Sequence, residues 1–333
     1  MASEPEPLTP DELEAVYRTE IRPVLFKAAA GGEEKPTLVL LGGQPGAGKS
    51  RATARILAEH PGMAAVTGDD LRIFHSGYRT LVAEHPEQVG AALAESTRVW
   101  VRAALTDALE QHRSLLLEGT FGDPDVTLAT AARFRDAGFQ VRIVAIASPR
   151  VLSVVSAASR YLRDRQAGNP ARFTRLSAHD RGYHGTTRLI GNLGEAAPAD
   201  RVTIISRNGN TLFDRQDAFA DAVTSLEEGR HPQSWGMHST VELLGELKQI
   251  TRYAIASGQL THDTAELLIE AHDLALTEVV PNLSIDPDSA QARLLQQSVT
   301  EQLVALRRAA APVELDSDQG LLPETASAGL ELG

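Results

Sequence analysis

The sequence predicts an α/β protein with a mainly parallel sheet of about five strands, followed by an all-α appendage. Through roughly the first two thirds of the chain, short apolar runs bounded by glycine or proline alternate with helical patterns, as in βαβ units. The run at 37–43 is continuously apolar, as expected for a strand that helices cover on both faces. Beyond about residue 231 only helical patterns remain.

The first predicted element is a helix. Thr9 is placed as its N-cap, Pro10 occupies the first helical position and Glu12 follows the cap by three residues, after which an amphipathic pattern continues to about residue 30. The elements predicted after it are strands at 37–43, 63–67, 114–120, 139–147 and 201–205, and helices at 50–60, 86–113, 123–138, 149–166 and 177–191.

Turn signals mark the ends of several of these elements. Asp123-Pro124 starts one helix and Gly138 ends it. Asn208-Gly209 is a tight-turn signal, which predicts that the fifth strand pairs with residues 211–213 in a hairpin.

The chain changes character near residue 231. A linker-like stretch is followed by helical patterns at 239–257, 261–279 and 288–310, which we interpret as a three-helix appendage. The last residues hold five acids and no basic side chain and are predicted to be a disordered tail. The predicted division is therefore a domain at 1–230, the appendage at 231–310 and the tail at 311–333.

Charge and cysteine content exclude several classes of protein. The 333 residues carry a formal net charge of −12, which argues against nucleic-acid or anionic-membrane binding because both rely on a basic surface. Without cysteine there is no disulfide framework, thiolate metal site or cysteine nucleophile. No apolar run approaches the roughly 20 residues that span a bilayer, and the acidic start does not have the pattern of a signal peptide, so we expect a cytoplasmic protein.

The charges are unevenly distributed. Residues 150–215 hold 11 arginines, no lysine and 5 acids, whereas the residues from 216 onward hold 6 basic and 19 acidic side chains. The arginine block is either a solvated helix face or an anion site.

Residues 43–50 match the phosphate-binding pattern G-x-x-x-x-G-K-[ST]. The match follows an apolar strand and opens a helix, so that backbone N–H groups and the helix N-terminus face the phosphate oxygens. Lys49 is expected to reach the β- and γ-phosphates and the Ser50 hydroxyl to bind Mg²⁺. The sequence therefore predicts a three-layer α/β/α, P-loop kinase-like fold. The residues predicted to bind the nucleotide are Gly43, Gln44, Pro45, Gly46, Ala47, Gly48, Lys49, Ser50 and Arg51.

Acidic residues follow two of the predicted strands. The second strand ends in Thr67-Gly68-Asp69-Asp70 and the third in Glu118-Gly119-Thr120, and the carboxyl ends of neighbouring parallel strands open on one crevice. We predict that Asp69 accepts the proton of a substrate hydroxyl during phosphoryl transfer. The alternative for Asp69, and the favoured interpretation for Asp70, is an N-cap. Glu118 either orients substrate or a metal-bound water, or braces the strand end.

Phosphoryl transfer also needs positive charge over the migrating group, and the arginine block is the dense source of it. Arg160 lies on the helix after the fourth strand. Arg172 follows Ala167-Gly168-Asn169-Pro170, which has the composition of a closing lid. Arg163, Arg165 and Arg175 are interpreted as solvated or as stabilising that lid.

Six motifs occur in a fixed order over about residues 10–228. They are the G-x-P-G-A-G-K-S loop, Gly68-Asp69-Asp70-Leu71-Arg72, Leu117-Glu118-Gly119-Thr120, Ser159-Arg160-Tyr161, Arg172 with Ser177-Ala178-His179-Asp180, and the hairpin segment at 202–212. Together they resemble the zeta toxin family, bacterial kinases of toxin–antitoxin systems.

The resemblance implies a reaction. It is the ATP- or GTP-dependent, Mg²⁺-assisted phosphorylation of UDP-N-acetylglucosamine at the 3′-hydroxyl of its hexosamine, which blocks cell-wall precursor synthesis. The residues that match by position are Asp69 as base, Lys49 as phosphate clamp, Arg160 and Arg172 as charge stabilisers, Glu118 and Thr120 as substrate contacts, and Ser50 and Glu118 as metal contacts.

One departure from the family concerns the sugar. The family places a substrate-gripping acid on the long helix before the third strand, where this chain has Arg102, with Glu95 two turns earlier. Two other functions therefore stay open: another small-molecule kinase, such as an antibiotic phosphotransferase, and a nucleotide-binding regulator without turnover.

The resemblance also bears on partners, because the family's antitoxin is a separate small helical protein that covers the nucleotide site. A separate antitoxin is therefore one expected partner. The acidic appendage is either a built-in inhibitor that faces the arginine block or a structural or dimerising extension.

Overall fold

The computed structural model describes residues 7–27, 32–194, 197–232 and 235–311. The predicted disordered tail lies outside the described residues from position 312 onward. Among the described residues, no helix combines the length and the apolar composition that crossing a membrane requires.

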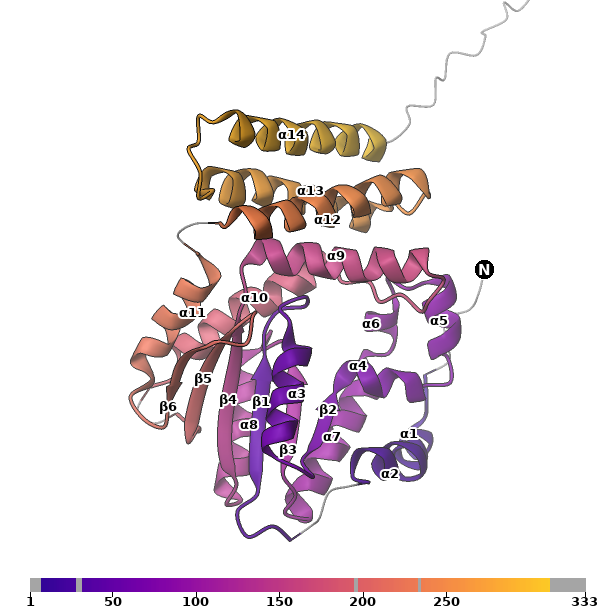
Figure 1. The fold of residues 1–333 in the computed structure, drawn as a ribbon. Coiled ribbons are helices and arrows are strands. Elements are labelled where there is room, and N and C mark those ends of the chain that lie inside the picture. The colour runs from indigo at the N-terminus through magenta and orange to yellow at the C-terminus, as the bar shows by residue number, and fades with distance from the viewer. Residues whose placement is uncertain (1–6, 28–31, 195–196, 233–234, 312–333) are drawn as a thin grey trace, which may run out of the picture.

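A six-stranded sheet forms the centre of the α/β part, in the order β2-β3-β1-β4-β5-β6 (Figure 1). The strands are β1 (Thr37–Gly42), β2 (Ala64–Thr67), β3 (Leu115–Gly119), β4 (Gln140–Ala147), β5 (Arg201–Ser206) and β6 (Thr211–Arg215). All neighbouring pairs are parallel except β5 and β6. The hairpin predicted at Asn208-Gly209 is thereby confirmed, and its second strand is the sixth strand of a sheet predicted to have about five.

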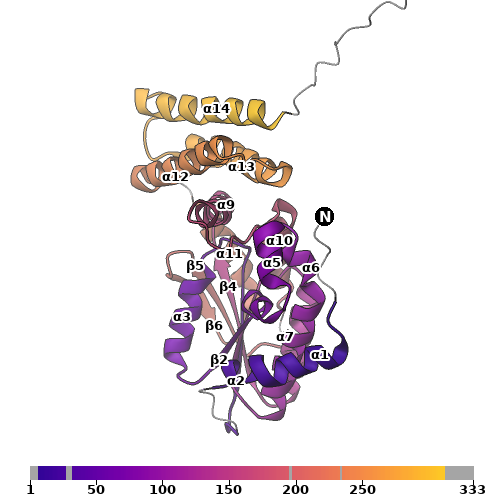
Figure 2. The same ribbon diagram turned by 90° about the vertical axis from the view of Figure 1, so that its right-hand side faces the viewer.

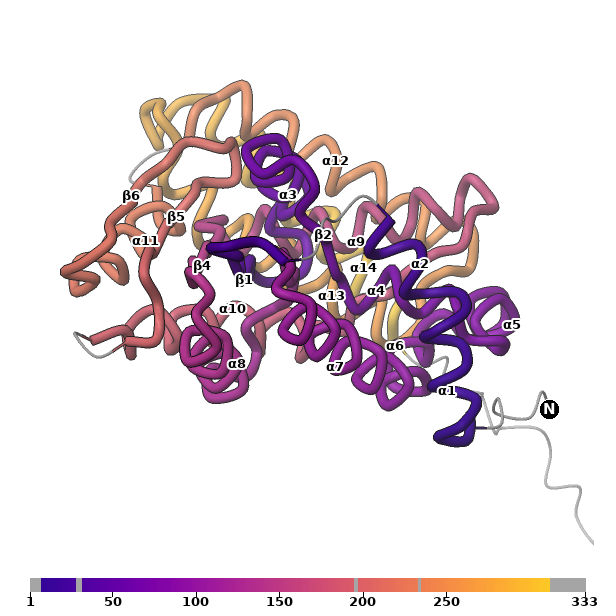
Figure 3. The backbone as a smooth tube through the Cα atoms, turned by 90° about the horizontal axis from the view of Figure 1, so that it is seen from below, coloured from indigo at the N-terminus to yellow at the C-terminus, as the bar shows by residue number. Residues whose placement is uncertain are grey.

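Helices cover both faces of the sheet, as the view from below shows (Figure 3). Those of the α/β part are α1 (Pro10–Val16), α2 (Arg22–Leu25), α3 (Lys49–Glu59), α4 (Gly68–Leu71), α5 (Tyr78–Glu84), α6 (Val89–Ala92), α7 (Ala94–Glu110), α8 (Pro124–Asp136), α9 (Arg150–Gln166), α10 (Leu176–Gly191) and α11 (Ala222–Arg230). A π-helical segment, Tyr17–Ile21, joins α1 to α2. The single helix predicted at 86–113 is wrong in detail, because Leu93 separates α6 from α7.

The continuous apolar character of β1 follows from its position. Leu38 and Leu40 pack into a cluster with residues of α7 and α8, whereas Val39 and Leu41 pack on the other face with residues of α3. Because β1 lies between β3 and β4, the chain leaves it toward one side of the sheet and later returns on the other. A crevice is expected at the carboxyl end of such a central strand.

Three further helices stack beyond α9, on the side away from the sheet (Figures 1 and 2). They are α12 (Met237–Ala256), α13 (His262–Leu274) and α14 (Ala290–Ala310), and a π-helical segment, Ala275–Val279, extends α13. The predicted C-terminal helices are therefore confirmed.

Helix α9 packs with the C-terminal helices as well as with the α/β part. Its residues Val151, Val155 and Leu162 share one hydrophobic cluster with Leu243 and Leu267 of α12 and α13. The division of the chain at residue 230 stays a prediction, and the packing shows that a helix before that residue belongs to the core of the helices after it.

Candidate active site

The predicted phosphate-binding loop joins β1 to α3 and packs against α9. Gly46 has a φ of 77° and Gly48, the residue before α3, has a φ of 97°, a region that favours glycine. A Cβ on Gly46 would lie 2.1 Å from the carbonyl oxygen of Ser153 on α9. Glycine at 46 is therefore required by both the backbone conformation and the close approach to α9.

A crevice of about 550 Å³ lies at the carboxyl ends of β2 and β3, over the first turn of α3. The loop residues that line it are Pro45, Gly46, Gly48, Lys49 and Ser50. Four other residues predicted to bind the nucleotide are described but do not line the crevice. Gly43, Gln44 and Ala47 are buried within the loop, and Arg51 is exposed outside the crevice.

The structure brings the remaining predicted site residues into this same crevice. They are Asp69 after β2, Glu118 and Thr120 at the end of β3, Arg160 on α9, and Arg172 between α9 and α10. The Lys49 ammonium points back into the loop, where its Nζ donates to the carbonyl oxygens of Gly43 at 2.9 Å and Gln44 at 3.3 Å. Lys49 and Asp69 therefore face one cavity.

Asp69 lies in α4 and does not cap it. The cap is Thr67, whose hydroxyl accepts the Asp69 backbone N–H at 3.3 Å. The Asp69 carboxylate forms ion pairs with Arg72, at 2.8 Å, and with Arg172. Two guanidinium groups thus hold this carboxylate at the edge of the crevice, so the N-cap interpretation of Asp69 is wrong.

Asp70, the next residue in α4, has a different environment. Asp70 is not among the described residues that line the crevice. Burial and the negative charges of Asp69 and Glu118 raise the pKa of its carboxyl. Thr67 also replaces Asp70 as the N-cap, so the cap predicted for Asp70 is wrong as well.

Two arginines of the crevice were not among the predicted site residues. Arg72 pairs with Asp69 one helical turn away, and that i, i+3 spacing was the available sequence signal. Arg207 follows β5, donates to the carbonyl oxygen of Gly46, and donates to the Ser156 hydroxyl at 2.6 Å. Its signal was a basic residue at the carboxyl end of a parallel strand.

The oxygen atoms near the loop fit a magnesium ion held mainly by phosphate. Ser50 places its hydroxyl in the first turn of α3, and the Glu118 carboxylate accepts a hydrogen bond from the Thr53 hydroxyl at 2.8 Å. The described residues contain no group of three or more acidic or histidine side chains able to hold a metal. Mg²⁺ commonly uses one or two protein oxygens together with substrate phosphates and water, so this donor set is compatible with it.

Lys49 has an unusual proton affinity. Burial lowers the pKa of its ammonium to about 8; Arg172 and Arg160 act in the same direction, and Glu118 and Asp69 oppose them. The ordinary value is roughly 10.4. In the nucleotide-free protein, a substantial fraction of Lys49 is therefore neutral in mildly alkaline solution.

We predict a pH dependence of nucleotide binding from this pKa. The protonated lysine binds phosphate, and phosphate esters are already fully ionised well above a pKa of about 6, so the affinity for ATP should fall about tenfold from pH 7 to pH 9. Titration calorimetry across this range would measure it. Lys49→Arg keeps its charge and should flatten the profile; the same slope in both proteins would contradict the assignment.

A buried chain of hydrogen bonds holds Gln44 of the loop in position. Gln44 donates to Ser153 Oγ at 3.1 Å, Ser153 Oγ lies 2.9 Å from His179 Nε2, and His179 Nδ1 lies 3.0 Å from Asp180. Arg150 then joins Asp180, at 2.7 Å, to Glu270 of α13. The chain therefore connects the phosphate-binding loop to the C-terminal helices.

Ser153, His179 and Asp180 stabilise the structure of the loop and do not form a hydrolytic site. Ser153 and His179 have no exposed surface. Burial would raise the pKa of the Asp180 carboxyl, but the hydrogen bonds from His179 and Arg150 hold it well below its usual range. Burial lowers the pKa of His179. A neutral imidazole between a carboxylate and a hydroxyl fixes the position of Gln44.

Arg102 and Glu95, the residues that this chain has where its sequence departs from the family pattern, are not among the described residues that line the crevice. Arg102 is exposed on α7 and lines a separate hollow beside α1, and Glu95 pairs with Arg98. Val101 is the α7 residue that lines the crevice. Within the described part of the chain the C-terminal helices supply no lining residue, so an inhibitory role for them would have to act through α9 rather than by filling the crevice.

Comparisons with known proteins agree with this architecture. "Toxin PezT" of Streptococcus pneumoniae serotype 4 (strain ATCC BAA-334 / TIGR4) is 28% identical over 198 residues, which is 59% of this chain and 78% of that protein. "Toxin zeta" of Streptococcus pyogenes is 29% identical over 183 residues, which is 54% of this chain and 63% of the relative, so the match spans less than two thirds of the relative's length.

A solved structure from the PezAT chromosomal toxin–antitoxin system of Streptococcus pneumoniae matches with a TM-score of 0.64 at 24% identity, covering 74% of this chain and 98% of that one. This likeness confirms the P-loop kinase-like fold. The family model for zeta toxins matches residues 25–218, more than half of the sequence. The chain therefore belongs to the zeta toxin family.

Proposed function

We propose that this protein is a kinase that transfers the γ-phosphoryl group of ATP or GTP to a hydroxyl group of a small molecule. The observation that carries the proposal is the placement of Lys49 and Asp69 in one crevice, with Arg72, Arg160 and Arg172 around it. A phosphate clamp, a hydroxyl-binding carboxylate and a surplus of positive charge are the groups that phosphoryl transfer requires.

Each residue has a definable task in the proposed reaction. The acceptor hydroxyl donates a hydrogen bond to Asp69, and its oxygen attacks the γ-phosphorus as the bond to the β–γ bridging oxygen breaks. The hydroxyl proton passes to the Asp69 carboxylate, and the nucleoside diphosphate leaves with the bond electrons. Because the transition state is loose, the proton moves late, so the Asp69 carboxylate first orients the hydroxyl and then takes up its proton.

Arg172 has two anionic partners available in this scheme. It is paired with Asp69 in the structure, and a γ-phosphate in the crevice would compete for its guanidinium. Exchange of Arg172 from carboxylate to phosphate would free one Asp69 oxygen for the acceptor. Arg160 and Lys49 would stabilise the charge on the transferred group, and Mg²⁺, held by Ser50 and Glu118 with the phosphates, would neutralise further charge.

UDP-N-acetylglucosamine, phosphorylated at its hexosamine 3′-hydroxyl, is the acceptor that we propose first. Membership of the zeta toxin family supports it, and so does the space beside Asp69 and Thr120. We further propose that the protein acts as the toxin of a toxin–antitoxin pair. Its relatives named as toxins, and the solved structure from the PezAT system, support a separate antitoxin as partner.

A second candidate is a kinase for a different hydroxyl compound, such as an antibiotic. The observation that favours it is Val101 on the crevice wall, at the helix where the family places a substrate-gripping acid. An aliphatic side chain there offers no hydrogen-bond acceptor to a sugar hydroxyl.

One experiment separates these candidates. The protein is incubated with Mg-ATP and a panel of UDP-sugars and aminoglycosides, and each acceptor is examined by mass spectrometry for one added phosphoryl group, with Lys49→Ala as the control. Phosphorylated UDP-N-acetylglucosamine would support the first proposal, and a product from another acceptor alone would support the second. ATP binding without any product would instead indicate a regulator without turnover.

A further inference from the structure

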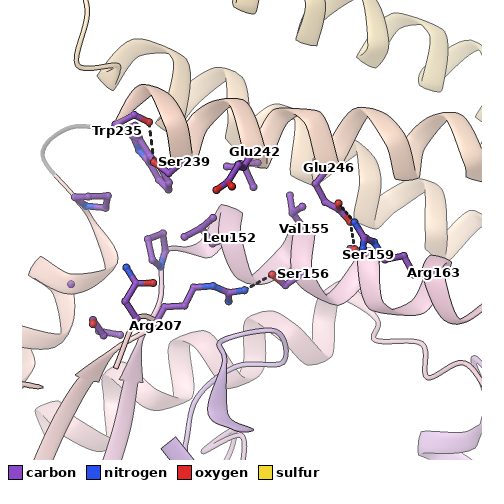
Figure 4. Close-up of a pocket in the computed structure, with 18 residues that line it drawn as sticks. Leu152, Val155, Ser156, Ser159, Arg163, Arg207, Trp235, Ser239, Glu242 and Glu246 are labelled. Atoms are coloured by element: carbon purple, nitrogen blue, oxygen red, sulfur yellow. Dashed lines mark hydrogen bonds and ion pairs between the residues drawn. The ribbon is translucent and has the colours of Figure 1, made fainter. Parts of the chain in front are cut away.

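A second cavity, of about 780 Å³, lies between α9, the end of β5 and the start of α12 (Figure 4). Its floor comes from α9 and the turn after β5, and its far wall comes from α12 and Trp235. The volume is within the roughly 300–1,000 Å³ of small-molecule sites. No residue that we assign to the phosphates or to the acceptor is among the described residues that line this cavity, so neither of those ligands explains it.

This cavity continues from the phosphate crevice. Arg207 and Ser156 line both spaces, and the hydrogen bond between them marks the boundary. Figure 4 shows Arg207 extending from the end of β5 toward Ser156 on α9. On the crevice side, the same guanidinium donates to Gly46 of the phosphate-binding loop.

The position of Asp69 sets the direction of a bound triphosphate. The γ-phosphate must lie near Asp69 and Glu118, which follow β2 and β3 on one side of β1. The other end of the phosphate chain must then point toward β4 and β5, on the opposite side. There the turn after β5 contacts the first turn of α3, where Arg51 donates to the carbonyl oxygen of Asn208 at 3.2 Å. The second cavity opens at this place.

The lining suits a flat aromatic base joined to a sugar. Leu152, Val155 and Leu243 present apolar surface, and the buried Trp235 closes one end. Arg207 offers a planar cation of the kind that stacks on aromatic rings. Asn208, Ser239 and Glu242 add the few polar groups that orient a ligand in a mainly apolar pocket.

We propose that this cavity holds the nucleoside of the phosphate donor, so that α12 of the C-terminal helices forms part of the nucleotide site. The inference rests on the proposed kinase function and deepens it. Glu246 keeps the wall in place through ion pairing with Arg163, with 2.8 Å from Nε to Oε1, and a hydrogen bond from Ser159 (Figure 4). Because the nucleoside contacts both α9 and α12, donor binding stabilises the docking of the C-terminal helices on α9.

Point variants in the full-length protein test this better than truncation, because removing the C-terminal helices would expose the apolar face of α9. Ser239 and Glu242 are exposed, one helical turn apart, and both line the cavity. Ser239→Trp and Glu242→Trp would each fill part of it. Val241 is exposed on the same helix and is not among the described lining residues, so Val241→Trp is the matched control.

The probes are ATP, with GTP in parallel, and inorganic tripolyphosphate, each measured by titration calorimetry. The two cavity-filling variants should weaken nucleotide binding by at least about tenfold and leave tripolyphosphate binding within about twofold, whereas Val241→Trp changes neither. Unchanged nucleotide affinity in both filling variants would overturn the proposal, as would equal affinities of the unaltered protein for ATP and tripolyphosphate. If neither ligand binds the unaltered protein, the proposed kinase function is wrong. This inference, which rests on that function, is then wrong as well.

Discussion

Replacement of Lys49 by alanine should reduce the rate of phosphoryl transfer by about 10³-fold or more. Lys49 lines the crevice with Asp69, and its ammonium donates to the loop carbonyls that surround the phosphate position. Loss of a single group that stabilises transition-state charge typically lowers kcat by about 10²–10³-fold, and loss of a charged one acting on a phosphoryl group by up to about 10⁵-fold. Steady-state kinetics with the acceptor found in the mass-spectrometric screen would measure the effect.

The matched control is Lys35→Ala. Lys35 is exposed just before β1 and lies outside the lining of the crevice within the described residues. Its loss should leave kcat and KM within about twofold, because isolated surface substitutions change little. Retention of activity in Lys49→Ala would contradict the phosphate-clamp role, provided that thermal unfolding shows a normally folded variant.

Asp69→Asn should lower kcat by about 10²–10⁴-fold while leaving nucleotide affinity unchanged or tighter. The amide keeps the shape of the side chain but cannot take up the hydroxyl proton. It also removes the negative charge that Arg72 and Arg172 now neutralise, so both guanidinium groups become available to the triphosphate. The measurement is a split readout, with kcat from turnover and ATP affinity from calorimetry.

Asp70→Asn provides the adjacent control. Asp70 shares α4 with Asp69 but is not among the described residues that line the crevice. We expect less than about a tenfold change in kcat, because the substitution does not remove a group that contacts the reacting atoms. Equal losses in the two variants would indicate that α4 acts through its fold, and would contradict the role of Asp69 as hydroxyl-binding carboxylate.

Local patterns predicted most of the secondary structure. Thr9 and Asp123 cap helices through the hydrogen bonds that their side-chain oxygens accept, and Asn208-Gly209 turns β5 into β6. These signals work because each depends on atoms only a few residues apart. The break between α6 and α7 was missed, since an isolated glycine such as Gly90 is tolerated in a helical pattern and no proline lies between Val89 and Glu110.

The structure brings together predicted site residues that lie at or after the carboxyl ends of parallel strands, and their functional roles stay predictions. Lys49, Asp69 and Glu118 come from the carboxyl ends of neighbouring parallel strands, so the topology alone brings them together. Gln44 and Ala47 belong to the loop motif but are buried within it and do not line the crevice, because a tight loop must bury some of its residues. Arg72 and Arg207 were missed because their signals, a spacing of three residues from Asp69 and a position after β5, do not show which group each guanidinium contacts.

By itself, the sequence determined the family, the α/β class, the glycine-rich loop before α3 and the three helices at the end of the described chain, because periodicity, capping and glycine patterns are local properties. Only the tertiary structure decided which arginines enter the crevice, that Asp69 is held by two of them, and that α9 packs against both the glycine-rich loop and the C-terminal helices. These features depend on contacts between segments far apart in the chain. The cavity at the boundary of α9 and α12 is of the same kind, since its walls come from residues as distant as Ala147 and Glu246.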